Sequence, residues 1–548
     1  MWILGITSPL SLNSAAALLL DGKIIASAEE ERFTRVKRAA GFIPHNSIEY
    51  VLNQANIRHD DIEKIAIGAE GPSNENELDR FCAISAACGS LTTVGAEKEK
   101  RTWKVTMMKQ RKLMDYLNRN FEKSEIYFVT HHLAHAASAC YVSGFKKSLF
   151  FTPDGRGEFE SGLLGIFHDD EFEVVKRLHI NESLGKMYSD FTTSLGWTRS
   201  LEEGKVMGLA PYGKPKESLE DIAIVKNDLK LKIDFEKIKS LKIESNGSDP
   251  TKDERKDIAA TAQHLLEKCV LPQIDYLVSI SGITNLCLAG GTALNIDLNG
   301  RILESTQIKN IFIQPASSDA GTALGAALFI HKQYSDKKIE KMEHPYLGPE
   351  YDDDKIKKDI VDSGLKYEEL SNVAKEVAEL ISKNKVIGWM QGRAELGPRA
   401  LGNRSLLANP TDPDMWKKVN SVKGRESWRP LAPSIMEENI DDFFVNHNSK
   451  SPFMLLKFQA KKEKISQIPA VVHVDGSSRP QTVSKKTNNL YWNLIKEFKK
   501  IQGVPLLLNT SLNLRGEPIV NNPQDALETL FLSNIDYVCI GKYLVSKN

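Results

Sequence analysis

The sequence lacks the features that mark exported, disulfide-bonded or membrane-spanning proteins. Its six cysteines are scattered over 548 residues and none forms a Cys-x2-Cys pair, which excludes a compact disulfide framework and a zinc-ribbon pattern. No run approaches the roughly 18 apolar residues of a membrane span, and the first residues lack the basic and apolar regions of a secretory signal. We therefore expect a cytoplasmic protein with reduced, mostly buried thiols.

The sequence also lacks any excess of one charge. Lysine plus arginine equals aspartate plus glutamate, 72 each, which argues against a nucleic-acid partner and leaves anion binding to local clusters. The length exceeds what one core supports, so two or three domains are expected. Residues 334–354 are charged and contain two prolines and a glycine. We place the boundary there and expect domains over residues 1–345 and 355–548.

A strand–loop–strand–turn–strand pattern occurs twice in the first domain. Residues 3–6, 15–20 and 23–28 read as strands, with a polar loop at 7–14, and the same order returns at 149–152, 162–168 and 172–177 with a polar loop at 153–161. The repeat indicates two related α/β lobes whose polar loops face a cleft, as in the actin-like ATPase superfamily, where such loops hold nucleotide phosphates. Hairpins are common, so two unrelated hairpins fit the pattern equally well.

A histidine pair follows the strand expected at residues 126–129. His131 and His135 are four residues apart at the start of an alanine-rich stretch, so on a helix they lie on one face. Two imidazoles at that spacing bind one cation when carboxylates complete the shell. The alternative is local: His131 caps the helix, and His132 and His135 pack or hydrogen-bond nearby.

Two further loops lie between expected strands and helices. Gly290 and Gly291 follow the strand at 285–288 and lead through Asn295 into a helix, an arrangement that lets backbone N–H groups approach a phosphate. Asp319 follows the strand at 311–313 and precedes the helix at 322–331. As a short polar residue at a helix start, it fits a helix N-cap as well as a ligand.

The second domain combines α/β elements with arginine-rich loops. We expect helices at 372–383 and 523–532 and strands at 386–390, 504–508 and 537–540, the last of these ending the fold. Cations in glycine- and proline-rich loops sit on stiff backbone, which favours bidentate binding of phosphate or carboxylate over a purely solubilising role. Structural salt bridges are the alternative. The residues are Arg393, Arg399, Arg404, Lys423, Arg425, Arg429, Arg479 and Arg515.

Many segments, in order along the chain, resemble the O-carbamoyltransferase family of the nodulation and antibiotic-tailoring type (NodU/CmcH-like). They include Ala28-Glu29-Glu30-Glu31-Arg32-Phe33-Thr34-Arg35, residues 131–137, Asp154-Gly155-Arg156-Gly157-Glu158, residues 204–213, residues 289–295, Ser318-Asp319-Ala320-Gly321, residues 397–405, residues 429–434 and residues 509–518. Any one of these segments is weak evidence by itself. The resemblance rests on their number and on their order along the chain.

The resemblance implies an actin/Hsp70-like (ASKHA-type) two-lobed first domain and a smaller YrdC-like α/β second domain. It implies that carbamoyl phosphate and ATP, with Mg(II), yield a carbamoyl-adenylate in the second domain. The first domain then passes the carbamoyl group to a hydroxyl of a small molecule, a sugar or natural product, using a bound divalent metal. Iron is the metal in the family's pattern, and Mn(II) or Zn(II) suit the same donors.

The resemblance also assigns residues. The metal set is His131, His135, Asp154 and Asp319. Arg399, Lys423, Arg429, Arg479 and Arg515 bind the phosphates, with Arg404 and Arg425 as adjacent candidates. Gly290, Gly291 and Asn295 line the nucleotide loop, and the catalytic candidates are Lys37, His132, Arg399 and Lys423. For Lys37 a solvated lysine and for His132 an ordinary hydrogen-bonding role are the alternatives.

One position departs from the family pattern. Many members carry His-Asp at the end of the first polar loop, where this chain has Leu12-Asn13. The histidine is a candidate base for the acceptor hydroxyl, so the acceptor base is unidentified here. A tRNA threonylcarbamoyl-type transferase, or a nucleotide-binding regulatory protein that has lost transfer, is the alternative function. The sequence leaves open which hydroxyl is carbamoylated and whether the chain forms a homodimer.

Overall fold

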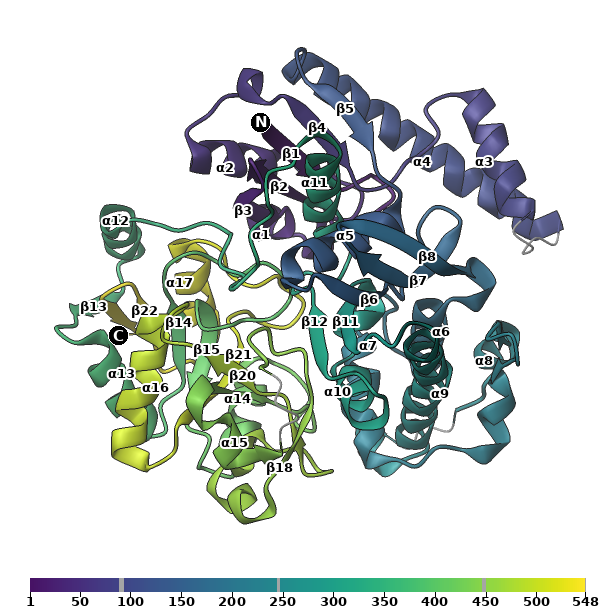
Figure 1. Ribbon diagram of the computed structural model, residues 1–548. Helices are drawn as coiled ribbons and strands as arrows, with labels where there is room; N and C mark the ends of the chain where they lie inside the picture. Colours follow the sequence, from purple (N-terminus) through teal and green to yellow (C-terminus); the bar gives the residue numbers. More distant parts are fainter. Residues whose placement is uncertain (88–92, 244–246, 446–449, 548) are drawn as a thin grey trace. The chain divides into compact units, whose positions relative to one another are not determined.

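The computed structural model describes residues 1–87, 93–243, 247–445 and 450–547. The chain separates into two compact units (Figure 1). Unit 1 comprises Met1–Thr34 and Arg38–Met342, and unit 2 comprises Arg35–Lys37 and Glu343–Asn548. Among the described cysteines, four are buried, Cys82 is partly buried, and all are free thiols; Cys88 lies outside the described residues.

Unit 1 is built from two five-stranded sheets with the same topology. The first has the order β3-β2-β1-β4-β5, from β1 (Trp2–Ile6), β2 (Ala15–Leu20), β3 (Lys23–Glu29), β4 (Lys64–Ile67) and β5 (Glu125–Phe128). The second has the order β8-β7-β6-β11-β12, from β6 (Lys147–Phe151), β7 (Glu160–His168), β8 (Glu171–His179), β11 (Asn285–Leu288) and β12 (Asn310–Ile313). In both, an antiparallel meander continues into two parallel strands. The predicted pair of related, actin-like lobes is therefore confirmed.

Two central helices pack against each other within unit 1. Helix α5 (His131–Ser143) leaves the first sheet after β5, and α11 (Ala320–Tyr334) leaves the second after β12. The contact is close because it is made by small residues: a Cβ on Gly325 of α11 would lie 1.8 Å from the carbonyl oxygen of Ala134. A Cβ on Gly5 of β1 would likewise lie 1.9 Å from the carbonyl oxygen of Ala323. Gly325 therefore lets α5 and α11 approach each other closely, and Gly5 lets α11 approach the first sheet.

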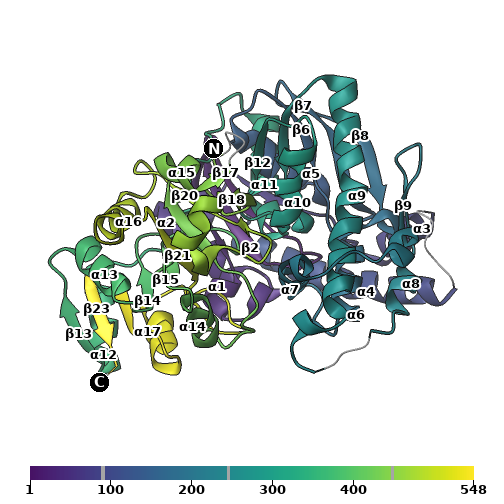
Figure 2. The same cartoon turned by 90° about the horizontal axis from the view of Figure 1, so that it is seen from below.

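Unit 1 contains further helices besides α5 and α11. They include α2 (His45–Ala55), α3 (Glu75–Ala87), α4 (Thr93–Asn120), α9 (Arg255–Ser281) and α10 (Ile296–Ser305). Helices α3 and α4 form a long excursion between β4 and β5, visible at the periphery in Figures 1 and 2. Their contact is an aromatic cluster in which the ring centroids of Phe81 and Trp103 are 4.9 Å apart. The corresponding connection in the second lobe is the single helix α10.

Unit 2 is a smaller α/β domain around an eight-stranded mixed sheet of order β13-β23-β22-β14-β15-β21-β16-β20. Its strands are β13 (Lys366–Glu369), β14 (Ile387–Met390), β15 (Arg404–Ala408), β16 (Ala432–Met436), β20 (Gln481–Val483), β21 (Leu506–Ser511), β22 (Tyr537–Ile540) and β23 (Tyr543–Ser546). Helices α13 (Val373–Ser382) and α16 (Asn489–Gln502) pack over a core that contains Trp389, Tyr491 and Phe498. Helix α17 occupies Pro523–Leu532, as predicted. The smaller α/β domain expected after the actin-like one is thus present.

The prediction that residues 537–540 form the last strand is wrong. They form β22, but the chain turns at Gly541, whose φ is 56°, and returns antiparallel as β23. Glycine adopts this left-handed backbone at little cost. The added strand carries β13 at the edge of the sheet.

Candidate functional site

Helix α5 carries both histidines of the predicted metal set. Thr130 occupies the N-cap position without a side-chain capping bond, and Gly144 ends the helix with a left-handed φ of 80°. Every residue of α5 except Leu133 is buried, which the small side chains of its alanine-rich sequence permit beside α11. His131 is the first helical residue rather than the cap, and His135 lies one turn further along the same face.

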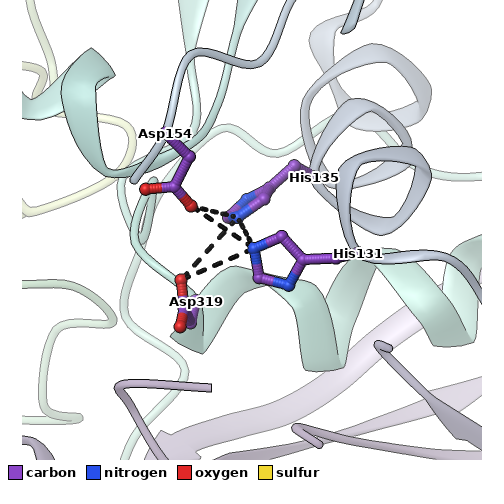
Figure 3. Close-up of side chains that lie close together, drawn as sticks. All are labelled: His131, His135, Asp154 and Asp319. Atoms are coloured by element: carbon purple, nitrogen blue, oxygen red, sulfur yellow. Dashed lines mark hydrogen bonds and ion pairs between the residues drawn. The ribbon is translucent and has the colours of Figure 1, made fainter. Parts of the chain in front are cut away.

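The four predicted metal-binding side chains converge on one point of unit 1 (Figure 3). One potential ligand atom from each of His131, His135, Asp154 and Asp319 lies within 4.8 Å of all the others. The two Nε2 atoms are 3.1 Å apart, and each is 3.3 Å from Oδ2 of Asp154. Oδ1 of Asp319 lies 3.7 Å from Nε2 of His131 and 3.9 Å from that of His135.

This donor set fits a divalent metal ion. Two imidazole nitrogens pointing at each other gain little from one shared proton, whereas a cation between them satisfies both. Within the described residues, Nδ1 of His135 is buried without a hydrogen-bond partner, whereas the second nitrogen of a metal-bound imidazole usually donates a hydrogen bond. Two neutral imidazoles with two carboxylates are the donors that Fe(II), Mn(II) and Zn(II) prefer.

Without a cation, the pKa values of His131, Asp154 and Asp319 are shifted by burial and by their neighbours. Burial would lower the pKa of His131, but its hydrogen bond to Asp154 and the charges of both aspartates outweigh burial and raise it to about 9. Burial would raise the pKa of Asp154, yet its bonds to the two histidines hold it well below the usual range. Burial and the neighbouring Asp154 raise the pKa of Asp319. The cluster therefore holds protons that a metal ion would displace.

Asp319 precedes α11 but does not cap it with its side chain. Its Oδ2 instead accepts a hydrogen bond from the backbone N–H of Leu12, in the polar loop between β1 and β2. The side chain of Asp319 therefore does not act as a helix N-cap, which was the alternative for this residue. The contact places Leu12 beside the metal-binding cluster, and the Leu12 side chain is 46% exposed.

Glu158, the last residue of the Asp154-Gly155-Arg156-Gly157-Glu158 segment, is a site residue that the sequence does not predict. It is buried, and its two carboxylate oxygens accept hydrogen bonds from the backbone N–H of His131 at 3.1 and 3.2 Å. Oε1 also accepts from the N–H of Glu70 at 3.1 Å. Glu158 thus supplies the negative charge at the N-terminus of α5 that the cap position lacks.

The contacts of His132 do not fit the catalytic role considered for this residue. Its Nε2 lies 3.1 Å from the carbonyl oxygen of Glu160 and its Nδ1 lies 3.4 Å from Oγ1 of Thr152. Burial and the charges of His131 and His135 lower the pKa of His132 to about 3. A neutral imidazole with both nitrogens engaged fits the hydrogen-bonding alternative considered for this residue.

The glycine loop packs against the Asp154 loop. A Cβ on Gly290 would lie 2.5 Å from the carbonyl oxygen of Pro153, and one on Gly291 would lie 2.9 Å from Oδ1 of Asp154. Asn295 accepts a capping bond from the N–H of Leu298 and donates to Gln263 at 2.8 Å. The two glycines therefore permit the close approach that holds Asp154, and Asn295 caps α10.

In unit 2, five of the predicted cations form a cationic cluster that consists of Arg399, Lys423, Arg425, Arg429 and Arg479. Burial and the charges of Arg479 and Arg429 lower the pKa of Arg399 to about 9. Burial and neighbouring cations, Lys37 among them, also hold the pKa of Lys423 well below its usual range. Burial and the charges of Arg429 and Arg479 likewise lower the pKa of Arg425. Cations that repel one another in a partly buried cluster are stabilised when an anion binds.

Lys423 is the buried lysine of this cluster. Its Nζ donates to the backbone carbonyl oxygen of Asn513 at 3.0 Å and to the side-chain oxygen of the same residue at 2.8 Å, and it also donates to the carbonyl oxygen of Ser511. Two carboxylates also lie near these cations: the charge of Glu517 acts on Lys423, and Glu426 lies 3.9 Å from Arg429 and 3.8 Å from Arg515. The Arg515 side chain is 63% exposed and lies at the rim.

Arg404 is placed differently from these residues. It is 1% exposed, and every nitrogen of its guanidinium donates to backbone carbonyls. The acceptors belong to Pro349, Gln391, Gly392, Asn403 and Asn521. A guanidinium held in this way joins loops of unit 2 to one another. Arg393 likewise donates to the carbonyl oxygens of Leu347 and Gly348.

Comparison with known proteins places the sequence among characterised families. A family model described as "Carbamoyltransferase N-terminus" matches residues 2–328, and one described as "Carbamoyltransferase C-terminus" matches residues 378–547. The nodulation protein NolNO of Sinorhizobium fredii is 36% identical over 98% of this chain and 79% of its own. The nodulation protein NolO of Bradyrhizobium diazoefficiens is 37% identical over 76% of this chain and 79% of its own.

Solved structures are more distant. The HypF protein of T. kodakarensis aligns at 13% identity and a TM-score of 0.36, over 62% of this chain and 48% of its own. Component A of the Acidaminococcus fermentans (R)-2-hydroxyglutaryl-CoA dehydratase aligns at 15% identity and a TM-score of 0.34, over 61% of this chain and 98% of its own.

Within the described residues, none of the helices has both the length and the apolar character needed to cross a bilayer.

Proposed function

Because the chain belongs to the carbamoyltransferase family, whose two models match 2–328 and 378–547, we propose that it is an ATP-dependent O-carbamoyltransferase of a small-molecule hydroxyl. In this proposal carbamoyl phosphate supplies the carbamoyl group and a carbamoyl-adenylate is the intermediate. The NodU-like relatives support carbamoyl transfer. The route through ATP and the division of the chemistry between the units are our inference from the two sites.

Adenylation is assigned to unit 2. A water oxygen forms a bond to the phosphorus of carbamoyl phosphate and the bond from that phosphorus to the carbamate oxygen breaks, which gives carbamate and inorganic phosphate. A carbamate oxygen then forms a bond to the α-phosphorus of ATP, and the bond to the leaving pyrophosphate breaks. Both steps place negative charge on phosphate oxygens, so fixed cations contribute by positioning and electrostatic stabilisation. The cationic cluster supplies these charges, with Arg515 at its rim and Lys37 adding its charge beside Lys423.

Transfer is assigned to unit 1. The acceptor oxygen forms a bond to the carbamoyl carbon, the bond from that carbon to the AMP oxygen breaks with its electron pair leaving on AMP, and the hydroxyl proton is released to water. His131, His135, Asp154 and Asp319 would hold the metal, Fe(II) first and Mn(II) or Zn(II) as alternatives. Such a metal, when bound, acts as a Lewis acid toward oxygen ligands. Glu158 keeps His131 in place, and Gly290 and Gly291 keep the Asp154 loop in place.

Some candidates are left out of the proposed machinery. His132 and Asn295 have their polar atoms engaged by neighbouring groups, and Arg404 is saturated by carbonyls. We assign these three to structure. Lys37, Arg399 and Lys423 remain the proposed catalytic cations. The Nζ of Lys423 is held by oxygens of Ser511 and Asn513, so Lys423 contributes its charge from a fixed position. Mg(II) is expected to accompany ATP.

The observation that carries the proposal is the mutual repulsion within the cationic cluster. Burial together with like charges lowers the pKa of Arg399 to about 9, and the pKa values of Lys423 and Arg425 also lie well below their usual ranges. An arrangement that opposes its own charge is stabilised by a polyanion, and ATP with carbamoyl phosphate is the anionic pair that carbamoyl transfer offers.

The test is to incubate the purified protein with ATP, Mg(II) and carbamoyl phosphate without an acceptor. We expect pyrophosphate release and a product with the mass of carbamoyl-AMP. Lys423→Met should abolish both because it removes a buried cation of the cluster. Lys418→Met changes an exposed lysine that is paired with Asp536 and should leave both unchanged.

The division of labour needs a second comparison. His135→Ala should form carbamoyl-AMP at the wild-type rate and fail to carbamoylate acceptors, because it removes a metal ligand of unit 1. His264→Ala, at an exposed position of α9 beside Glu220, is the matched control and should do both. If His135→Ala and Lys423→Met lose adenylate formation equally, the assignment of the two steps to separate units is wrong.

A further inference from the structure

A short segment from the N-terminal part of the chain belongs to unit 2. The segment is Arg35–Lys37, and the residues on both sides of it belong to unit 1. Burial and neighbouring cations lower the pKa of Lys423, and Lys37 is one of those cations. Like charges move apart unless the fold restrains them. The contacts that restrain Lys37 therefore bear on the adenylation site proposed for unit 2.

Arg35 attaches this segment to the rest of unit 2. Its Nη1 donates to the carbonyl oxygen of Ile519 at 2.7 Å, and its Nη2 donates to that of Pro518 at 3.0 Å. Nη1 also lies 3.5 Å from Oδ2 of Asp525, a carboxylate in the capping box of α17. A planar guanidinium that binds several acceptors in this way fixes its own backbone relative to theirs.

The backbone that receives Arg35 is continuous with the backbone that holds Lys423. Nζ of Lys423 donates to the carbonyl oxygen and to the side-chain oxygen of Asn513. Nδ2 of Asn513 donates in turn to the carbonyl oxygen of Glu517 at 2.7 Å. Residues 513–519 therefore hold Lys423 at one end and Arg35 at the other.

The backbone next to Lys37 adopts a conformation that is unusual for residues other than glycine. The φ angle is 57° at Arg35, 65° at Arg38 and 45° at Ala39. Such backbone persists where the contacts around it hold it in place, and it gathers at functional sites. On the C-terminal side of Lys37, the N–H of Arg38 donates to the carboxylate of Glu31. On the N-terminal side, the guanidinium contacts of Arg35 have the same effect.

We propose that Arg35 is a positioning residue for carbamoyl-adenylate formation: its guanidinium fixes residues 35–37 to residues 518–519 and thereby holds Lys37 at the cationic cluster. Lys37 then adds its charge where negative charge develops on the phosphates. Arg35 acts through Lys37 and does not contact the substrates. This inference rests on the proposed function and adds to it the residue that keeps one of its cations in place.

The experiment is a double-mutant cycle on carbamoyl-AMP formation by the full chain with ATP, Mg(II) and carbamoyl phosphate. Lys37→Met should lower kcat about 100-fold, because it removes a cation from the site. Arg35→Met should lower kcat about tenfold, because Lys37 is present but no longer held. The double variant should be no slower than Lys37→Met alone, since Arg35 then has nothing to position.

An arginine with a purely structural role would give a different result. Its loss would slow the reaction by the same factor whether or not Lys37 is present. Arg35→Lys keeps the charge but not the bidentate contact, so it should lower kcat about threefold, and only when Lys37 is present. Arg177→Met is the matched control. It removes an exposed arginine that is paired with Glu160 at 2.7 Å and should leave kcat unchanged.

Hydrogen exchange reports the positioning without any reaction. In Arg35→Met, the amides of residues 36–37 and 513–520 should exchange faster than in the wild type, whereas Arg177→Met should not change them. The proposal is overturned if exchange in these segments stays at the wild-type rate, or if Arg35→Met still costs tenfold in the Lys37→Met background. Absence of carbamoyl-AMP from the wild type refutes the proposed function instead, and exchange then decides whether Arg35 holds Lys37.

Discussion

Glu158→Gln isolates what a single buried carboxylate contributes to the metal-binding cluster. The carboxylate contacts the N–H of His131 through both oxygens and the N–H of Glu70 through one. Glutamine in the same position keeps one oxygen but places an amide NH2 against one of these donors. It also removes the negative charge from the N-terminus of α5, the helix that carries both imidazole ligands.

The expected magnitude follows from these contacts. A hydrogen bond to a charged group contributes about 1.5–3 kcal/mol and a neutral one about 1 kcal/mol, so losing charge assistance on two N–H groups costs about 2 kcal/mol. The helix dipole adds about 0.3–1 kcal/mol. An opposing effect is small: the Glu158 charge is the weakest of the factors that raise the pKa of His131, so its loss only slightly reduces proton competition. We expect metal affinity to fall 10- to 100-fold.

The assay is a chelator competition that gives the Kd for Mn(II) and Zn(II), paired with hydrogen exchange of the α5 amides, which should open more readily in the variant. Glu160→Gln is the matched control, because that carboxylate forms an exposed pair with Arg177 worth at most about 1 kcal/mol. A Glu158→Gln protein whose Kd stays within twofold of the wild type would refute the assigned role of this carboxylate.

Three further predictions follow from individual contacts. The pKa of His131 is about 9 in the metal-free protein, and an imidazole that binds a metal must be neutral. Metal binding at pH 7 should therefore release close to one proton, and the affinity for the metal should rise as the pH rises towards 9. Calorimetry in buffers of different ionisation enthalpy measures the proton release, and its absence would contradict the prediction. Arg404→Met should destabilise unit 2 by about 3 kcal/mol or more, because it leaves several buried carbonyls unpaired; urea unfolding of the variant checks this, and a loss below 1 kcal/mol would argue against it. Gly325→Ala should destabilise unit 1 by about 1–3 kcal/mol, because the new Cβ would meet a backbone carbonyl of α5 at 1.8 Å; Gly204→Ala, with open space around it, is the control, and equal unfolding midpoints for the two would contradict the packing argument.

Local patterns in the sequence determined the two lobes and one face of the metal-binding cluster. The alternation and turns of residues 3–28 and 149–177 predicted both meanders, because strand periodicity and turn residues act over a few positions. The i, i+4 spacing placed His131 and His135 on one face of α5 for the same reason. The positions of Asp154 and Asp319 beside them came from the family resemblance, since no local pattern relates residues 23 and 188 positions away from His131.

What only the tertiary structure decided was which polar groups already have partners. The sequence offered Arg399 and Arg404 as similar arginines in one loop, yet burial among cations distinguishes the first and five loop carbonyls take up the second. The sequence likewise places His132 next to His131, but only the folded structure shows that both ring nitrogens of His132 have hydrogen-bond partners. Hydrogen-bond partners come from segments distant in the chain, as Leu12 and Asp319 show. The sequence therefore gives the chemical type of each residue, whereas long-range packing determines whether its polar atoms are available to a ligand.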